Sequence, residues 1–134
     1  MTEDSMRQPN GIVTKLSPRS VPDTVARLTD MLTGKGLKVF ATIDQSAEAG
    51  AAGLTLRETV LVLFGNPAAG TLVMQAAPLS ALDLPLKVLV WADGAQTKVT
   101  YVAPAALGAR YQLTADLTAK LAGIDPLTDA LVAP

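Results

Sequence analysis

The chain has 134 residues, the length of one ordinary domain, and its 49% hydrophobic and 17% charged residues exclude an intrinsically disordered protein. A net charge of −1, with the basic residues spread singly along the chain, argues against a nucleic-acid partner. Cysteine and histidine are both absent, which excludes disulfides, thiolate or imidazole catalysis and the usual zinc sites, so any metal would have to be a hard ion with oxygen ligands.

The first third of the chain predicts a tail, a strand and a helix. Residues 1–10 are polar, so we expect a flexible tail in front of a single domain over residues 11–134. Alternating side chains over 12–17 predict a strand. The helix begins after Ser20, whose hydroxyl can cap the first turn, and it ends near Gly34. Its apolar face is marked by residues at helical spacing: Val21, Val25, Leu28 and Leu32.

The middle third predicts two strands, each followed by a short helix. Residues 37–44 form the next predicted strand, and regular alternation along it places four side chains on one face: Leu37, Val39, Ala41 and Ile43. The alanine-rich segment 46–53 predicts a short helix. Residues 58–64 predict the third strand, and residues 68–77 a second short helix.

The last third predicts a hairpin and a C-terminal helix. Strands over 86–91 and 96–102 flank Asp93-Gly94, a strong signal for a tight β-hairpin. Pro126 is expected to kink or restart the final helix. That helix is marked by apolar residues at helical spacing: Leu113, Leu117, Leu121 and Ile124. The order strand, helix, four strands, helix, with short extra helices, is typical of an α+β two-layer domain whose sheet is at least partly antiparallel.

Two of the predicted strands are mostly apolar on both faces. They cover 58–64 and 86–91, whereas a two-layer domain needs only one apolar sheet face. The second face could be covered by the alanine-rich segments, by a second copy of the chain or by a ligand. Burying four such side chains would contribute roughly 1.5–3 kcal/mol each. Together with the low surface charge, this favours a homodimer, which charged substitutions of Phe40 or Leu89 are expected to weaken.

The most distinctive motif is the run FGNPAAGT over residues 64–71, which joins a strand to a helix. Asn66 fits an N-cap, Pro67 fits the first helical position, and Gly65 removes a side chain where the backbone can approach closely. One interpretation is a seat for an anion or small ligand at the helix N-terminus, and the other is a plain strand-to-helix turn. A phosphate loop is excluded because no lysine follows Gly70.

Carboxylates supply the remaining candidate chemistry. Asp44, followed by Gln45, ends the second strand and could share a helix face with Glu48, so the two acids could do acid–base work or hold a hard cation. The alternative is that Asp44 or Ser46 caps the short helix. Asp83, before a Leu-Pro pair, could cap or accept backbone hydrogen bonds. The acids available to a carboxylate-dependent enzyme are Asp44, Glu48, Glu58 and Asp83.

Three blocks of the sequence resemble one family. They are Ile43-Asp44, FGNPAAGT at 64–71 and LDLPLKVLVW at 82–91. In combination they make residues 10–133 similar to the domain-of-unknown-function 302 family. The resemblance implies a curved, mainly antiparallel sheet of the TATA-binding-protein-like type, a bacterial or archaeal source and a dimer in crystals, but no established activity. Where many relatives have a histidine this chain has Gln45, and where another branch has cysteines it has Gly65 and Leu86.

The leading hypothesis is therefore a non-enzymatic, homodimeric binding or interaction module. We expect it to be bacterial and cytoplasmic, with no nucleic-acid or membrane partner. The alternative is a small-molecule binding protein that takes an anion or an apolar ligand in a cleft near the Asn66-Pro67 turn. Its candidate ligand-binding residues lie at strand ends and turns, where function concentrates: Asp44, Gln45, Gly65, Asn66 and Asp83. A carboxylate-dependent enzyme is the third hypothesis, and we expect no catalytic residue, metal or cofactor.

Overall fold

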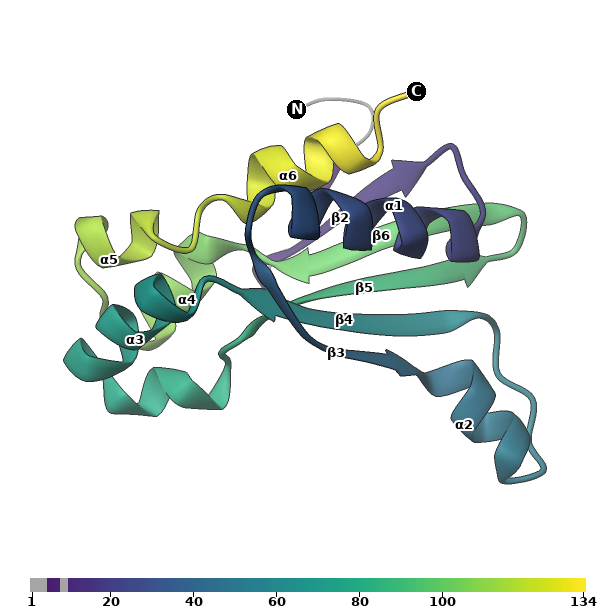
Figure 1. Cartoon of the computed structure of the whole chain (residues 1–134), viewed down its shortest axis with the longest axis horizontal. Coiled ribbons are helices and arrows are strands. Elements are labelled where there is room, and N and C mark those ends of the chain that lie inside the picture. Colours follow the sequence, from purple (N-terminus) through teal and green to yellow (C-terminus); the bar gives the residue numbers. More distant parts are fainter. Residues whose placement is uncertain (1–4, 8–9) are drawn as a thin grey trace.

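The computed structural model of the chain describes residues 5–7 and 10–134. It contains a six-stranded sheet in the order β1-β2-β6-β5-β4-β3, in which every neighbouring pair is antiparallel. The strands are β1 (Ser5–Arg7), β2 (Ile12–Ser17), β3 (Lys38–Asp44), β4 (Thr59–Gly65), β5 (Leu86–Asp93) and β6 (Gln96–Val102). Helices α1 (Val21–Gly34) and α6 (Ile124–Leu131) cover one face of this sheet, which confirms the α+β two-layer fold (Figure 1).

The remaining helices lie at the two ends of the sheet. Helix α2 (Gln45–Ala51) extends from one end. The opposite end carries a cluster of short helices (Figure 1). These are α3 (Pro67–Ala76), the 3-10 helix η1 (Pro78–Leu82), α4 (Pro104–Arg110) and α5 (Ala115–Ala119). Because β3 begins, β4 ends and β5 begins at this second end, the FGNPAAGT turn and the Leu84-Pro85 segment meet there.

The core lies between the sheet and the pair α1 and α6. Helix α1 begins where expected, since the Ser20 side chain accepts the N–H of Asp23 at 3.2 Å. Its apolar stripe is buried against the sheet, with Leu28 and Leu32 fully enclosed. The sheet side chains that face these helices alternate along their strands: Val13, Val60, Val62, Phe64, Val88, Val90, Val99 and Tyr101. This alternation leaves the other side chains of the same strands on the opposite face.

Strand β3 departs from the expected alternation. Val39 pairs with Phe64, but Ala41 pairs with Leu63, so Phe40 is an extra residue in a β-bulge. A bulge shifts the following side chains to the other face. The expected common face for Val39, Ala41 and the other two apolar residues is therefore wrong, because Val39 shares the helix-covered face with Phe64 whereas Ala41 lies beside Leu63 on the opposite one.

The C-terminal segment forms two separate helices. Helix α5 ends at Ala119 and α6 begins at Ile124. Pro126 has no N–H to donate to the carbonyl of Ala122, so a continuous helix could not pass through it, whereas a first helical turn tolerates proline. The expectation that Pro126 restarts the helix is therefore confirmed.

The N-terminal tail also contains structure that the sequence did not predict. Residues 5–7 form β1, which pairs with the outer edge of β2, where the sequence predicted only a tail. This pairing satisfies backbone groups that an edge strand leaves open. Gly11, with a φ of 83°, helps to turn the chain between the two strands. Residues 1–4 and 8–9 of the expected tail lie outside the described residues.

A buried lysine fastens α6 to the sheet. Lys15 lies on the helix-covered face of β2 and is only 2% exposed. Its Nζ donates to Thr128 Oγ1 at 2.6 Å and to the carbonyl of Asp125 at 3.1 Å, and it lies 2.8 Å from the carboxylate of Asp129. The same ammonium sits 5.2 Å from the centre of the Tyr101 ring. No sequence pattern marked Lys15, because the contact depends on how α6 docks.

Candidate functional site

The face of the sheet opposite α1 and α6, here called the open face, is the first candidate surface. The strand pairings align one residue from each of five strands into a row across it: Thr14, Thr100, Leu89, Leu61 and Ile43. The three apolar members are half-buried or exposed, with Ile43 36% exposed. None of the helices in the described part of the chain packs along this row. The strands that the sequence predicted to be apolar on both faces are therefore covered by helices on one face only.

The polar groups of the open face already have partners. The indole Nε1 of Trp91 donates to Thr100 Oγ1 at 3.0 Å. Lys98 lies 5.4 Å from the centre of the Trp91 ring and 2.7 Å from the carboxylate of Asp93, and its hydrogen bond and charge hold the pKa of Asp93 below its usual value. Lys87 donates to the carbonyls of Asp83 and Pro85, at 3.3 Å and 3.2 Å. Covering this face would therefore not bury a lysine that lacks a partner.

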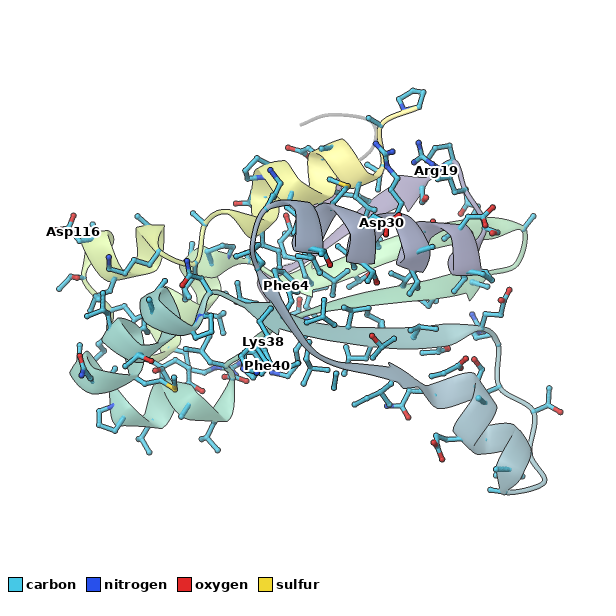
Figure 2. The ribbon with its side chains drawn as sticks, in the orientation of Figure 1. Arg19, Asp30, Lys38, Phe40, Phe64 and Asp116 are labelled. Carbon is cyan, nitrogen blue, oxygen red and sulfur yellow. The ribbon has the colours of Figure 1, made fainter. Side chains whose placement is uncertain are left out.

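A pocket of about 310 Å³ is the second candidate, at the sheet end that carries the short helices. The β3 bulge directs Phe40 into it, and Figure 2 shows Phe40 next to Lys38 at the start of this strand. The Nζ of Lys38 lies 5.1 Å from the centre of the Phe40 ring. The opposite walls come from α3, the Leu84-Pro85 segment and the residues after α5. The other lining residues are Gly65, Asn66, Pro67, Ala69, Gly70, Thr71, Met74, Leu84, Pro85, Leu86, Lys120 and Leu121.

Asn66 caps α3 as the sequence predicted. Its side-chain oxygen accepts the N–H groups of Ala68 and Ala69, at 3.0 Å and 3.3 Å. The Gly70 N–H bonds the carbonyl of Asn66 at 2.9 Å, in the ordinary helical pattern. Since these bonds occupy the first-turn donors, the motif matches the plain strand-to-helix turn, and the turn forms one wall of the pocket rather than an open anion seat.

Asp44 and Gln45 do not join this site. Asp44 pairs with Val60 at one end of β4, whereas Gly65 lies at the other end, about 17 Å away at 3.3 Å per residue. The expected convergence of Asp44 and Gln45 with the Asn66 turn is therefore wrong, because antiparallel pairing sends their strand ends in opposite directions. Asp44 instead caps α2, accepting hydrogen bonds from Ser46 Oγ at 2.6 Å and from the N–H of Ala47 at 2.9 Å. These hydrogen bonds lower the pKa of Asp44.

Asp83 lies next to the pocket, but its side chain is not part of the lining. Its carboxylate accepts the hydroxyl of Tyr111 and the guanidinium of Arg110, the latter at 2.9 Å. The Tyr111 hydrogen bond is the main cause that lowers the pKa of Asp83, and it raises the pKa of Tyr111 in return. Asp83 thus ties the segment before β5 to the end of α4. The expectation that the Asp83 side chain caps a helix or accepts backbone hydrogen bonds is therefore wrong, because its donors are the side chains of Arg110 and Tyr111.

Three carboxylates of the described residues have a resolved pKa shift. The resolved shifts among them all lower the pKa, at Asp44, Asp83 and Asp93, whereas a general acid at neutral pH needs a raised one. Residues 5–7 and 10–134 hold no cluster of three or more acidic side chains that could bind a metal ion.

Some pocket residues escaped the sequence analysis. Phe40 was expected at a dimer contact on a regular strand, whereas the bulge turns it into the pocket. Lys120 and Leu121 were expected within a continuous helix, but they lie in the turn between α5 and α6. Met74 sits one helical turn after Gly70, a spacing that could have marked it as a neighbour of the motif.

The family comparison agrees with the sequence motifs. A model of the family described as "Domain of unknown function DUF302" matches residues 13–131. The chain belongs to the DUF302 family. A crystal structure of an uncharacterized conserved DUF302 protein from Bacillus stearothermophilus superposes with a TM-score of 0.77 at 21% identity, covering 91% of this chain and 95% of the other. This likeness confirms the fold that the resemblance implied.

Three curated relatives of this DUF302 chain carry a functional name. They are fluoride-specific ion channels from Brucella: FluC 1 of Brucella suis, FluC 1 of Brucella abortus and FluC 2 of Brucella melitensis. Each is 40% identical over 105 residues, which is 78% of this chain. The chain spans only 41% of the first relative and 39% of the other two.

Within the described residues, the DUF302 chain has no helix whose length and apolar character would let it cross a membrane.

Proposed function

We propose that this DUF302 protein is a homodimeric interaction module in which two copies pair through their open faces. The observation that carries the proposal is the row of two half-buried leucines and an exposed isoleucine across β5, β4 and β3, which continues into two threonines on β6 and β2. Removing apolar side chains from water is the main driving force of association. Low surface charge over the whole chain supports the same interpretation.

The size of the open face supports a modest affinity. Five strands about 4.8 Å apart and seven residues long at about 3.3 Å each give a flat area of roughly 19 Å by 23 Å. Side chains roughen this surface, so two faces would bury on the order of 1,000 Å², near the lower end for specific interfaces. We therefore expect a dissociation constant of about micromolar order.

Charge also favours a second copy as the occupant. The lysines of the open face are neutralised or hydrogen-bonded within their own chain, as described above. A partner with complementary charges would gain little from them, whereas an identical apolar row meets an identical row across a twofold axis. Phe40 does not belong to this row, since it lines the pocket, so Leu89 is the better probe of the interface.

Sedimentation velocity over about 1–100 μM tests this proposal. We expect the average mass to rise towards that of two chains, and we expect Leu89→Lys to stay monomeric with a melting temperature close to that of the wild type. Leu79→Lys is the matched control, because Leu79 is 71% exposed on η1, away from the open face. A compact monomer at every concentration, or a Leu89→Lys protein that dimerises like the wild type, would contradict the proposal.

The Brucella relatives suggest a second candidate, an accessory role beside a fluoride channel. In each of them a region similar to this chain shares one polypeptide with the rest of a protein named as a fluoride-specific channel. Such a fusion keeps two parts at high effective concentration. Deleting the gene for this chain should then make its host more sensitive to fluoride. Unchanged sensitivity would contradict the accessory role. A membrane partner of this kind would overturn the expectation that the chain has none.

The bacterial source and cytoplasmic location belong to the same proposal. The similar proteins reported above come from Brucella and from Bacillus, which supports a bacterial source. Cell fractionation with an antibody against the chain tests the location, and recovery in the membrane fraction would favour the channel-associated role over a free dimer.

A further inference from the structure

We propose that the pocket between the β3 bulge, α3 and Leu84-Pro85 binds a small amphipathic anion, with an alkyl or aryl body of about ten non-hydrogen atoms in all and a carboxylate directed at Lys120. This site is separate from the open face and does not depend on dimerisation. Its volume of about 310 Å³ lies at the lower limit of small-molecule sites, which run from roughly 300 Å³ upwards. At about 30 Å³ per water-sized group, it holds about ten such groups.

The walls of the pocket are suited to an apolar body. An aromatic ring, a thioether and aliphatic side chains form most of the surface, from Phe40, Met74, Leu84, Pro85 and Leu121. Polar side chains enter only from a few positions, and Asn66 among them already serves as the helix cap. Ligand sites of this kind gain affinity from the apolar walls and orientation from a small number of polar groups.

Two glycines leave the space empty without being required by the backbone. Neither Gly65 nor Gly70 has a positive φ, so both backbones would accept a side chain. A Cβ on Gly65 would lie 3.9 Å from both Phe40 and Pro85, and a Cβ on Gly70 would lie 3.9 Å from the end of Met74. These are ordinary contact distances. The cavity is therefore lined in part by small residues, and a Cβ at either position would meet only ordinary contacts.

The charge around the pocket selects an anion. Lys120 is the charged residue of the lining, and it is exposed at the C-cap of α5. An adjoining cavity of about 450 Å³ shares Gly65, Asn66, Leu86, Lys120 and Leu121 with the pocket and adds Lys35. Lys38 lies beside Phe40. Among the described residues no acidic side chain lines either cavity, whereas one lysine lines the apolar pocket, a second lines the adjoining cavity and a third lies beside Phe40. A negatively charged head group is the complement of that arrangement.

Octanoate, with about ten non-hydrogen atoms, is the probe that this volume calls for. Titrating it into the isotopically labelled full chain should shift the amide resonances of α3, Leu84 and Leu86. Octanol, which has the same chain length and no charge, should bind about fivefold more weakly, as expected for the loss of one exposed ion pair. Lys120→Met should reduce octanoate binding to the level of octanol and leave octanol binding unchanged.

Filling the pocket gives the decisive variant. Gly70→Leu places an alkyl group in the cavity at a helical position that favours leucine over glycine, so the protein should fold and lose octanoate binding by at least about tenfold. Gly50→Leu is the matched control, because Gly50 also lies in a helix, α2, but has no neighbouring atom within 4 Å of its Cβ position and is far from the pocket.

Three results would overturn the proposal. One is an octanoate response outside the pocket, such as on the open face. Another is equal binding of octanoate and octanol, which would show that the pocket does not prefer a negatively charged head group. The third is a Gly70→Leu protein that binds like the wild type. Repeating the titration on Leu89→Lys separates this site from the dimer, since a monomeric variant should still bind octanoate.

Discussion

Replacing Lys15 tests how α6 is held to the sheet. Lys15 is 2% exposed, and its ammonium donates to Thr128 and to the carbonyl of Asp125. Lys15→Ala removes the ammonium together with the buried methylene stem. Lys15→Met keeps a stem of similar length and removes only the ammonium. The two variants therefore separate packing from hydrogen bonding at one position.

The structure sets the expected magnitudes. Lys15→Ala removes three methylenes beyond Cβ, worth about 0.8 kcal/mol each, and leaves a cavity under α6, so we expect a loss of about 3 kcal/mol. Lys15→Met should cost less than about 1 kcal/mol, because a buried charge is removed while its former partners stay satisfied. Thr128 Oγ1 still donates to the carbonyl of Ile124 at 2.8 Å. The ion pair with Asp129 adds little, since that carboxylate is 70% exposed.

Urea unfolding followed by circular dichroism and by the fluorescence of Trp91, the single tryptophan, measures both changes at one protein concentration. For a chain of this size a loss of 3 kcal/mol corresponds to a drop in melting temperature on the order of 10 °C. Asp129→Asn serves as the control and should change stability by less than about 0.5 kcal/mol. If Lys15→Met were as unstable as Lys15→Ala, the ammonium and not the packing of its stem would hold α6, and the reasoning would be refuted.

Three further predictions follow from single contacts. Gly108→Ala would place its Cβ 2.5 Å from Thr118 Oγ1, so it should destabilise the chain by about 1–3 kcal/mol; in a thermal-denaturation double-mutant cycle Thr118→Ala should restore most of the loss, and additive effects would contradict the clash. Tyr111→Phe should raise the pKa of Asp83, which a carboxyl NMR titration measures. The lowered pKa stabilises the fold at pH values above the pKa of Asp83 in the unfolded chain, and this stability is lost as the pH falls through its pKa in the folded chain, so the stability of the variant should depend less on acid. An unchanged pKa would exclude this hydrogen bond as the cause. Asn66→Ala should cost about 1 kcal/mol in urea unfolding by removing two cap bonds, with Asn66→Asp, which keeps the acceptor, as the control.

Local features of the sequence were sufficient for most of the elements. Ser20 and Asn66 cap the helices that follow them, since a cap depends only on residues two or three positions away. The hairpin at Asp93-Gly94 forms with Asp93 opposite Gln96 and Gly94 at a φ of 59°. Apolar periodicity located α1 and all five predicted strands to within a residue or two. The family motifs added the fold class, which the domain match and the Bacillus structure confirm.

The sequence predicted only part of the candidate site. Asn66, Gly65 and the Leu-Pro pair were marked as turn residues and do meet in the pocket. Asp44 and Gln45 were grouped with them because all lie at strand ends, but strand ends meet only when the order and direction of the strands are known. The antiparallel pairing of β3 with β4 puts Asp44 at the far end of the sheet.

Tertiary structure alone determined the features that depend on contacts between distant segments. The bulge that turns Phe40 into the pocket arises where β3 pairs with β4, and a strand examined by itself shows only regular alternation. Lys15 is buried because α6, more than a hundred positions later in the chain, supplies its partners. Lys120 joins the pocket because the chain turns between α5 and α6. Periodicity and capping report on a few neighbouring residues, whereas burial and cavities depend on how complete elements pack.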